Sequence, residues 1–412
     1  MLNLPIANFF LFDPLTLFFL AVICIVSLPS LIYSFSYLKG EYSASKIVLA
    51  QILLFSFVLS MALVVSVRNC LIFLVFWEIM SLVSYFLVVF DSNHSRSITA
   101  GLIYIVMTHI GTAFIIAGFM ILHNYTHSFD FFAIKSASHL MPQQAKNIIF
   151  LLFLIGFGTK AGIVPLHIWL PYAHPQAPSH ISSIMSGVMI KTAIYGIIRF
   201  VFFILGVNSG WWGILVLILA VISCLVGVIY ALMEHDIKRL LAYHSVENIG
   251  IILLGVGLSM FFMNLNLTYL AVFALIAGLY HLVNHAIFKG LLFLCSGSVY
   301  KATGTRDIEK LGGLIKKMPH TAAYFLLGAM AISALPPLNG FVSEWLTLQA
   351  FFLGAFNIIR GSKLFLGVCA AMLALTGGLA AACFVKAFGI TFLAQPRSHF
   401  AKDAKEVALS MR

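Results

Sequence analysis

Long runs of apolar residues recur along the chain and are separated by short polar segments. An α-helix needs about 20 predominantly apolar residues to cross the ~30 Å hydrocarbon core of a bilayer. A window of about 19 residues is suited to finding such helices, and it predicts eleven membrane-spanning segments here. They cover residues 12–37, 46–67, 69–90, 97–122, 146–170, 178–204, 211–233, 239–260, 267–299, 318–353 and 364–393.

Two of the predicted spans contain residues that interrupt a helix. The fifth reads GFGTKAGIVPLHIWLP and includes Pro165, and the tenth reads ISALPPLNGFVSEW and includes Pro336 and Pro337. Proline removes a backbone donor and clashes with the preceding turn. Non-helical backbone at membrane depth persists only where protein or a water-filled cavity satisfies it. Paired breaks in a membrane protein therefore point to an ion path.

The breaks fall at corresponding places in two groups of five spans, the second to sixth and the seventh to eleventh. In each group the second span carries a carboxylate, the fourth is broken and carries an ionisable residue, and the fifth carries a lysine: Glu78, Lys160 and Lys191, then Glu247, Glu344 and Lys386. Because five is an odd number, two successive copies insert with opposite topology, as inverted repeats do.

The spans and their grouping predict an all-α polytopic membrane protein of about eleven transmembrane helices. We expect a first helix and loop at residues 1–45, a first inverted repeat at 46–204, a second at 211–393 and a cytoplasmic tail at 394–412. Two of the helices, the fourth of each repeat, are expected to be broken.

The composition supports a membrane location. Of the 412 residues, 62% are hydrophobic and 9% are charged, whereas soluble domains average about 45–50% and about 25%. A net charge of +11 would suit a nucleic-acid partner, but most lysines and arginines lie in short loops, as the positive-inside rule describes. Fourteen lie on one side, Lys238 and Arg239 among them, and six on the other. We therefore expect an inner-membrane protein with its N-terminus outside, its C-terminus in the cytoplasm and no nucleic-acid partner.

The remaining four of the 24 basic residues lie inside predicted spans: Lys160, Lys191, Lys289 and Lys386. Each charge at the bilayer centre costs about 2.5–3.5 kcal/mol on insertion scales. Together with the three intramembrane glutamates, these residues must face one another, water or backbone, and such a set marks a path for protons or sodium ions. The alternatives for a single residue are a structural ion pair or a lysine that reaches the interface, which best suits Lys386 near its span's end.

The ninth span adds a row of basic side chains in the sequence GLYHLVNHAIFKGLLF. His281, His285 and Lys289 are spaced four residues apart, so they line one helix face over about 12 Å. Histidine titrates near neutral pH, and such a row can pass a proton through intervening water. His244 and Glu247 lie in the preceding span. The row lacks paired carboxylates at ligand spacing, and we predict no metal site.

A further group of histidines follows the first break. His167, His174 and His180 lie around the proline-rich stretch VPLHIWLPYAHPQAPSH. They fit a relay at the mouth of a cavity and equally a rigid re-entrant turn, so both readings stay open.

Motifs for redox cofactors are absent from the sequence. The six cysteines form no CxxC pair, which argues against a disulfide framework, an iron–sulfur cluster or a zinc site. We find no Gly-rich phosphate loop, nucleophile elbow or dinucleotide fingerprint. We expect no cofactor and no redox or hydrolytic site in this chain, so the electron chemistry of any parent enzyme would belong to another subunit.

Five ordered stretches are recognisable: FWEIMSLVSYFLV, GTKAGIVPLHIWLPYAHPQAPS, GVMIKTAIYGIIRF, HDIKRLLAYHSVENIG and HLVNHAIFKGLLFL. They resemble the antiporter-like proton-pumping subunits of respiratory complex I and of multi-subunit Mrp antiporters. LPPLNGFVSEW and TRDIEKLGGL look most similar to the large membrane subunits of hydrogenase-4 and formate hydrogenlyase complexes. The resemblance implies a half-channel built on a Glu78–Lys160 pair, a central Lys191, the histidine–lysine row, and Glu344 on the second broken helix.

Both ends of the chain depart from the family pattern. Members usually carry two helices ahead of the segment that resembles LFDPLTLFFL, and at least one helix beyond TFLAQPRS. The resemblance therefore implies that the outer helices are missing here while both inverted halves are present.

The function implied is a proton-pumping membrane subunit of a hydrogenase or NADH-dehydrogenase-like complex, with other membrane subunits and a peripheral redox module as partners. A redox event in a partner would alter the Glu78–Lys160 pairing, change how readily Lys191 holds its proton, and send a proton along the row towards Glu344. Two alternatives stay open: an Mrp-like cation/proton antiporter powered by an ion gradient, and a non-transporting assembly scaffold. Glutamate and lysine serve either ion, so the choice between proton and sodium also stays open.

Overall fold

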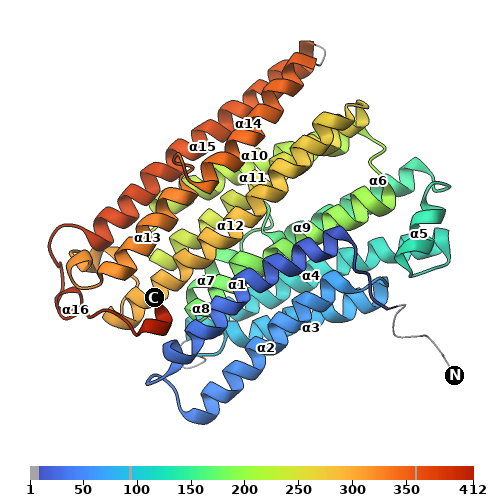
Figure 1. Ribbon diagram of the computed structural model, residues 1–412. Helices are drawn as coiled ribbons and strands as arrows, with labels where there is room; N and C mark the ends of the chain where they lie inside the picture. The colour runs from blue at the N-terminus through green and yellow to red at the C-terminus, as the bar shows by residue number, and fades with distance from the viewer. Residues whose placement is uncertain (1–8, 92–94, 358–359) are drawn as a thin grey trace.

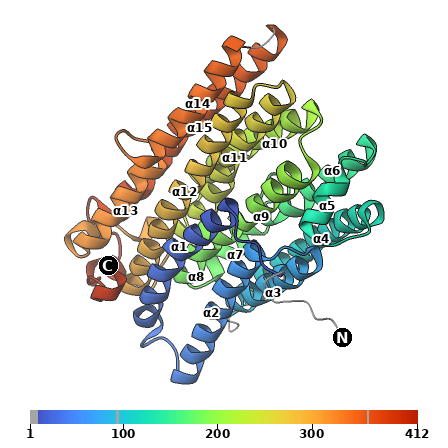
Figure 2. The same cartoon turned by 45° about the vertical axis from the view of Figure 1, so that its right-hand side comes forward.

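The computed structural model describes residues 9–91, 95–357 and 360–412, so residues 1–8 of the predicted first unit lie outside the described ranges. Within them, long helices run side by side (Figures 1 and 2). Both views show α14 and α15 at one end of the row and α2 and α3 at the other. In the described ranges, β-structure is limited to isolated bridge pairs.

Nine helices of the described ranges are long and apolar enough to cross a membrane, and they match nine of the eleven predicted spans. Eight are continuous α-helices: α1 (Pro14–Leu38), α2 (Ala44–Ser66), α3 (Cys70–Val88), α4 (Ser95–Thr126), α10 (Gly210–Met233), α11 (Ile237–Asn264), α12 (Thr268–Thr303) and α15 (Arg360–Phe392). The ninth joins α8 (Ser179–Ile184) and α9 (Ile190–Ile197) through the π-helical turn Met185–Met189, and a second π-helical stretch, Ile198–Leu205, follows it.

The other two predicted spans are the ones expected to be broken, and the structure confirms both breaks. The first contains α6 (Gln143–Ala161) and the gap after it, and the chain becomes helical again as α7 (Leu170–Gln176) at the last residue of the predicted span. The second divides into α13 (Pro319–Ile332) and α14 (Asn339–Asn357). Pro165 lies in the first gap, and Pro336 and Pro337 lie in the second. Gly162 ends α6 with a φ of +82°, and a Cβ at this position would collide with Leu170. Glycine adopts this left-handed conformation without the strain that a Cβ brings.

Two spans lie inside the protein, and the others surround them. In α11 and in the α8–α9 span, 94% and 89% of the apolar window is buried, against 33–50% in the other seven. A helix that is enclosed on all sides has no lipid-facing stripe, so its polar residues face other helices. Lys191, His244 and Glu247 belong to these two inner spans.

Close backbone packing fixes the position of α11 against α10. A Cβ added to Gly227 of α10 would lie 2.5 Å from the amide nitrogen of Glu247, which no real contact tolerates. Glycine at this position therefore lets the two helix backbones approach directly beside the buried carboxyl group.

The connections carry two short helices, α5 (Phe131–Ser138) and α16 (His399–Lys402). Beyond α16 the tail returns to the first residues of α13. The carboxylate of Glu406 accepts hydrogen bonds from the backbone amide of His320 at 2.9 Å and from the hydroxyl of Thr321 at 2.6 Å. A carboxylate that binds the free amides at a helix N-terminus is a capping interaction, so the tail holds the start of the second broken helix.

Candidate functional site

Lys160 lies in the last turn of α6, directly before the first break, and is buried. Its Nζ donates to Ser81 Oγ of α3 and to the hydroxyl of Tyr104 of α4, both at 2.9 Å. The Tyr104 hydroxyl also lies 2.5 Å from Ser84 Oγ. The expected Glu78–Lys160 ion pair is not formed in the structure. Ser81 lies about one turn along α3 from Glu78, so the ammonium meets the same helix one turn away from the carboxylate.

Glu78 pairs instead with a histidine that was not predicted from the sequence. His109 Nε2 of α4 lies 3.1 Å from Glu78 Oε2, and the two side chains are 53% and 33% exposed on the chain alone. The pair therefore lies on the outer surface formed by α3 and α4. His109 occupies the third span of the first predicted repeat, the place that His281 occupies in the second, and this correspondence was the signal that could have revealed it.

Lys191 lies at the centre of the molecule on α9 and is fully buried. Its Nζ donates to the backbone carbonyl of Ser186, in the π-helical turn. Such turns occur frequently at functional sites. The Ser186 hydroxyl lies 2.7 Å from that of Ser245 on α11, so the lysine's own helix turn is joined to the second half of the chain.

A chain of hydrogen bonds runs through the second half. His244 and Glu247 contact each other one turn apart on α11. The side-chain amide of Asn248 donates to the His244 carbonyl at 2.8 Å, and its oxygen lies 3.1 Å from His281 Nε2. Asn248 thereby joins the backbone of α11, at His244, to the histidine on α12.

The chain continues from His281 to the second break. His281 Nδ1 lies 3.0 Å from Ser343 Oγ on α14, and Ser343 also donates to the carbonyl of Gly340 at 3.0 Å. Glu344 is the next residue and is 8% exposed. It lines a pocket of about 290 Å³ together with Gly377 and Gly378 of α15. The hydrogen-bonded groups therefore lead from the middle of α11 to a carboxyl group beside the break.

His285 and Lys289 extend the row in the other direction along α12. Both are fully buried, and neither Lys289 Nζ nor either ring nitrogen of His285 has a hydrogen-bond partner among the described atoms. Buried polar groups are nearly always hydrogen-bonded to protein or to ordered water. These three nitrogens are therefore positions where water would complete the network.

Two other lysines of the long helices lie outside this network and bind helix ends. Lys386 Nζ donates to the carbonyls of Leu232 and Glu234 at 2.8 and 3.0 Å, where α10 ends. Lys238, which was predicted to lie at the cytoplasmic start of the eighth span, belongs to the first turn of α11 and is 3% exposed. Its Nζ donates to the carbonyl of Ala177 between α7 and α8. Cations suit helix C-termini because the last carbonyls carry partial negative charge.

Metal-ligating side chains do not gather in the part of the chain that the structure describes. It contains no group of three or more His, Cys, Asp or Glu side chains that could hold a metal ion, and its six cysteines are free thiols. The buried path instead consists of hydroxyl, amide, imidazole, amine and carboxyl groups, which donate or accept hydrogen bonds.

Comparison with known protein families gives two matches. Residues 67–374 match the family described as NADH:quinone oxidoreductase/Mrp antiporter, TM. Residues 2–46 match the family described as NADH-ubiquinone oxidoreductase (complex I), chain 5 N-terminus.

Curated relatives include three with informative names. The chain is 45% identical over 404 residues to hydrogenase-4 component B of Escherichia coli, a match that covers 97% of this chain and 59% of that protein. It is 41% identical to formate hydrogenlyase subunit 3 of Escherichia coli, a match that covers 84% of this chain and 55% of that protein. It is 32% identical to one of the Na(+)/H(+) antiporter subunits of Alkalihalophilus pseudofirmus, a match that covers 71% of this chain and 57% of that protein. The chain thus spans little more than half the length of these relatives.

Solved structures share the fold. A chain of the Mrp complex from a Dietzia species superposes with a TM-score of 0.78 at 23% identity, covering 97% of this chain and 72% of that one. A chain of the membrane-bound sulfane sulfur reductase, an archaeal respiratory membrane complex, superposes with a TM-score of 0.81 at 26% identity. The match covers 96% of this chain and 62% of that one.

Proposed function

The chain belongs to the NADH:quinone oxidoreductase/Mrp antiporter family, and on this basis we propose that it translocates protons as a membrane subunit of a hydrogenase-like or NADH-dehydrogenase-like complex. The observation that carries the proposal is the buried hydrogen-bonded series from Asn248 through His281 to Ser343, beside Glu344. The buried His244–Glu247 pair lies next to Asn248 on the same helix. Structural ion pairs alone would not require neutral bridging groups between them.

His281 is placed to change its protonation without losing a hydrogen bond. Because the Asn248 amide nitrogen donates to the His244 carbonyl, its oxygen is the atom that faces His281, and Nε2 acts as the donor. When the ring is neutral, Nδ1 accepts from the hydroxyl of Ser343. When the ring is charged, Nδ1 donates to that hydroxyl, which turns its own proton to the Gly340 carbonyl. A hydroxyl can serve in both ways because it is both donor and acceptor.

Lys160 has partners of the same kind. Two hydroxyl oxygens accept from its ammonium, and the same hydroxyls can donate to the lone pair of a neutral amine. A carboxylate partner would strongly favour the charged form. Hydroxyl partners bind both protonation states, which suits a residue that takes up and releases a proton.

The gap between Lys191 and the second-half series is expected to be bridged by water. Lys289 and His285 are buried without protein partners among the described atoms, and a proton can pass between such groups through ordered water. The path proposed is Lys160, Lys191, the histidine–lysine row and then Glu344, with His244 and Glu247 beside the row.

Membrane partners are supported by the Glu78–His109 pair. Its side chains are about one third and one half exposed on the isolated chain, and an ionisable pair that faces lipid at membrane depth is costly. We infer that another membrane protein of the complex covers this surface of α3 and α4. A peripheral redox module would supply the energy, and the N-terminus would lie outside with the C-terminus in the cytoplasm of an inner-membrane protein.

A second candidate is a cation/proton antiporter component that is powered by an ion gradient. The 32% identity to a protein named as part of a Na(+)/H(+) antiporter favours it. Its carboxyl and amine groups would then exchange sodium for protons, with no redox partner.

The test is proton uptake by proteoliposomes that contain the complex purified with this chain. We expect Lys160→Ala and Lys191→Ala to lower redox-driven uptake at least 10-fold, while Lys402→Ala, an exposed tail residue, leaves it unchanged. Unchanged uptake in both path variants would refute the proposed path. Uptake that needs a sodium gradient and no electron donor would support the antiporter, and an assembled complex that never transports would identify a scaffold.

A further inference from the structure

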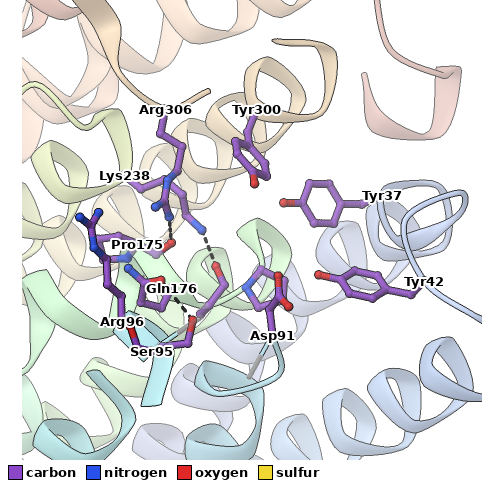
Figure 3. Close-up of a pocket in the computed structure, with 13 residues that line it drawn as sticks. Tyr37, Tyr42, Asp91, Ser95, Arg96, Pro175, Gln176, Lys238, Tyr300 and Arg306 are labelled. Atoms are coloured by element: carbon purple, nitrogen blue, oxygen red, sulfur yellow. Dashed lines mark hydrogen bonds between the residues drawn. The ribbon is translucent and has the colours of Figure 1, made fainter. Parts of the chain in front are cut away.

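A polar pocket of about 460 Å³ lies where several helix ends meet (Figure 3). Its walls come from the ends of α1 and α12, the start of α4, the first turn of α11 and the segment between α7 and α8. These ends lie on the face that the distribution of Lys and Arg predicts to be cytoplasmic. Residues at helix ends stand at the level of lipid headgroups.

Three cations line the pocket: Arg96, Lys238 and Arg306. Lys238 is only 3% exposed, and its ammonium has a backbone carbonyl as partner, with no carboxylate bound among the described residues. Arg306 binds the Pro175 carbonyl and lies 3.3 Å from Asp236. Arg96 is exposed and makes no hydrogen bond or ion pair within the described ranges. A buried charge is normally paired.

Three phenol groups face the same space. Figure 3 shows the hydroxyls of Tyr37 and Tyr42 directed into the pocket opposite Lys238, with Tyr300 beside them. Burial and the carboxylate of Asp91 raise the pKa of Tyr42 above its usual value. This phenol therefore keeps its proton and remains a hydrogen-bond donor.

We propose that this pocket binds a phosphate group, and that in the cell this phosphate belongs to the headgroup of an anionic phospholipid. Phosphate oxygens accept the hydrogen bonds that ammonium, guanidinium and phenol groups donate. Basic pockets between transmembrane helices on the cytoplasmic side bind anionic headgroups such as those of cardiolipin. Among the described lining residues Asp91 is the one acid, against three cations, of which Arg306 is also paired with Asp236 outside the lining. The proposal is independent of proton transport, and the two can be tested separately.

The experiment is native mass spectrometry of the full chain released from nanodiscs. One set of nanodiscs contains phosphatidylcholine alone, and a second contains phosphatidylcholine with phosphatidylglycerol or cardiolipin. We expect retained anionic lipid, lowered about 10-fold by Arg96→Gln and by Tyr42→Phe, in line with the strength of hydrogen bonds to charged groups. Lys317→Gln is the matched control because it removes an exposed charge on the same face but outside the pocket.

Lys238→Gln is a third variant with a different expectation. Lys238 also donates to the Ala177 carbonyl. We therefore expect Lys238→Gln to lower both the amount of bound lipid and the melting temperature of the chain. Arg96 has no such contact among the described residues, and its replacement separates binding from folding.

A competition arm identifies the source of the phosphate. If millimolar inorganic phosphate displaces the lipid, or binds by calorimetry with the same dependence on Arg96, the pocket is a general phosphate site. If neither lipid nor phosphate depends on Arg96 and Tyr42, or if phosphatidylcholine is retained equally well, the proposal is wrong.

Discussion

The ammonium of Lys160 binds the hydroxyl of Tyr104 at 2.9 Å and forms no ion pair with Glu78. Tyr104→Phe removes this hydroxyl and keeps the ring in place. A hydrogen bond to a charged group contributes about 1.5–3 kcal/mol, so proton uptake should fall at least 10-fold. Uptake in proteoliposomes measures this, with Tyr230→Phe on the exposed side of α10 as the control.

A result equal to the control would show that Ser81 alone supports Lys160. Glu78→Gln provides the complementary test. Because Glu78 contacts His109 and not Lys160, it should affect association with a neighbouring membrane protein, measured by co-purification, more than the folding of this chain.

The bridge at Asn248 should be sensitive to polarity more than to shape. Asn248→Leu leaves His281 Nε2 without its acceptor in a buried site, and an unsatisfied buried polar group costs about 1–3 kcal/mol. We expect a lower melting temperature and loss of proton uptake. Asn248→Asp retains the acceptor oxygen and should keep more of the activity. Equal behaviour of the two variants would argue against the bridge.

Backbone contact at Gly227 predicts a strong response to one methyl group. Gly227→Ala places a Cβ against the amide of Glu247, and overpacking of this kind costs about 1–3 kcal/mol. Thermal unfolding in detergent should show the loss. Gly378→Ala on α15 is the matched control, since nothing lies within 4 Å of the added Cβ. Equal melting temperatures for the two variants would contradict the packing described.

The Asp13–Arg199 pair predicts a pH dependence of stability. Asp13 caps α1 and binds the Arg199 guanidinium at 2.6 and 2.7 Å. Burial alone would raise its pKa, but the hydrogen bonds and charge of Arg199 lower it from 3.8 to about 2. A depressed folded-state pKa adds stability that is fully present above pH 3.8 and is lost as pH falls through about 2.

Asp13→Asn should therefore remove the part of the stability that changes with pH between about 4 and 2. Melting temperatures measured across this range report it. The same slope in the variant and the unmodified chain would mean that another group is responsible.

The number and position of the spans could be predicted from the sequence because bilayer thickness fixes how long an apolar helix must be. The predicted 211–233 is observed as Gly210–Met233. The two breaks were also predicted, because prolines and glycines cluster there: Pro165 follows Gly162, and Pro337 precedes Gly340. A single proline does not always end a helix, since α1 continues through Pro29.

The hydrogen-bond and ion-pair partners of the charged residues could not be predicted in the same way. Whether Lys160 meets Glu78 or Ser81 depends on a shift of one turn between two helices, which packing decides and periodicity does not. Asn248 and Ser343 were missed because uncharged polar side chains lack the insertion cost of a charge, which was the signal that marked the other residues. The predicted eighth span began at Arg239, one residue after Lys238. The observed helix includes Lys238 because Asp236 caps α11 by accepting from the amides of residues 238 and 239.

The cap that Glu406 places on α13 has a mechanical consequence. A helix that is fixed at one end can tilt only about that end, and the displacement of its residues grows towards the other end. α13 is clamped at His320 and Thr321 and ends at Ile332. Any tilt of α13 is therefore largest at Ile332, beside the proline gap that leads into α14 and its buried Glu344.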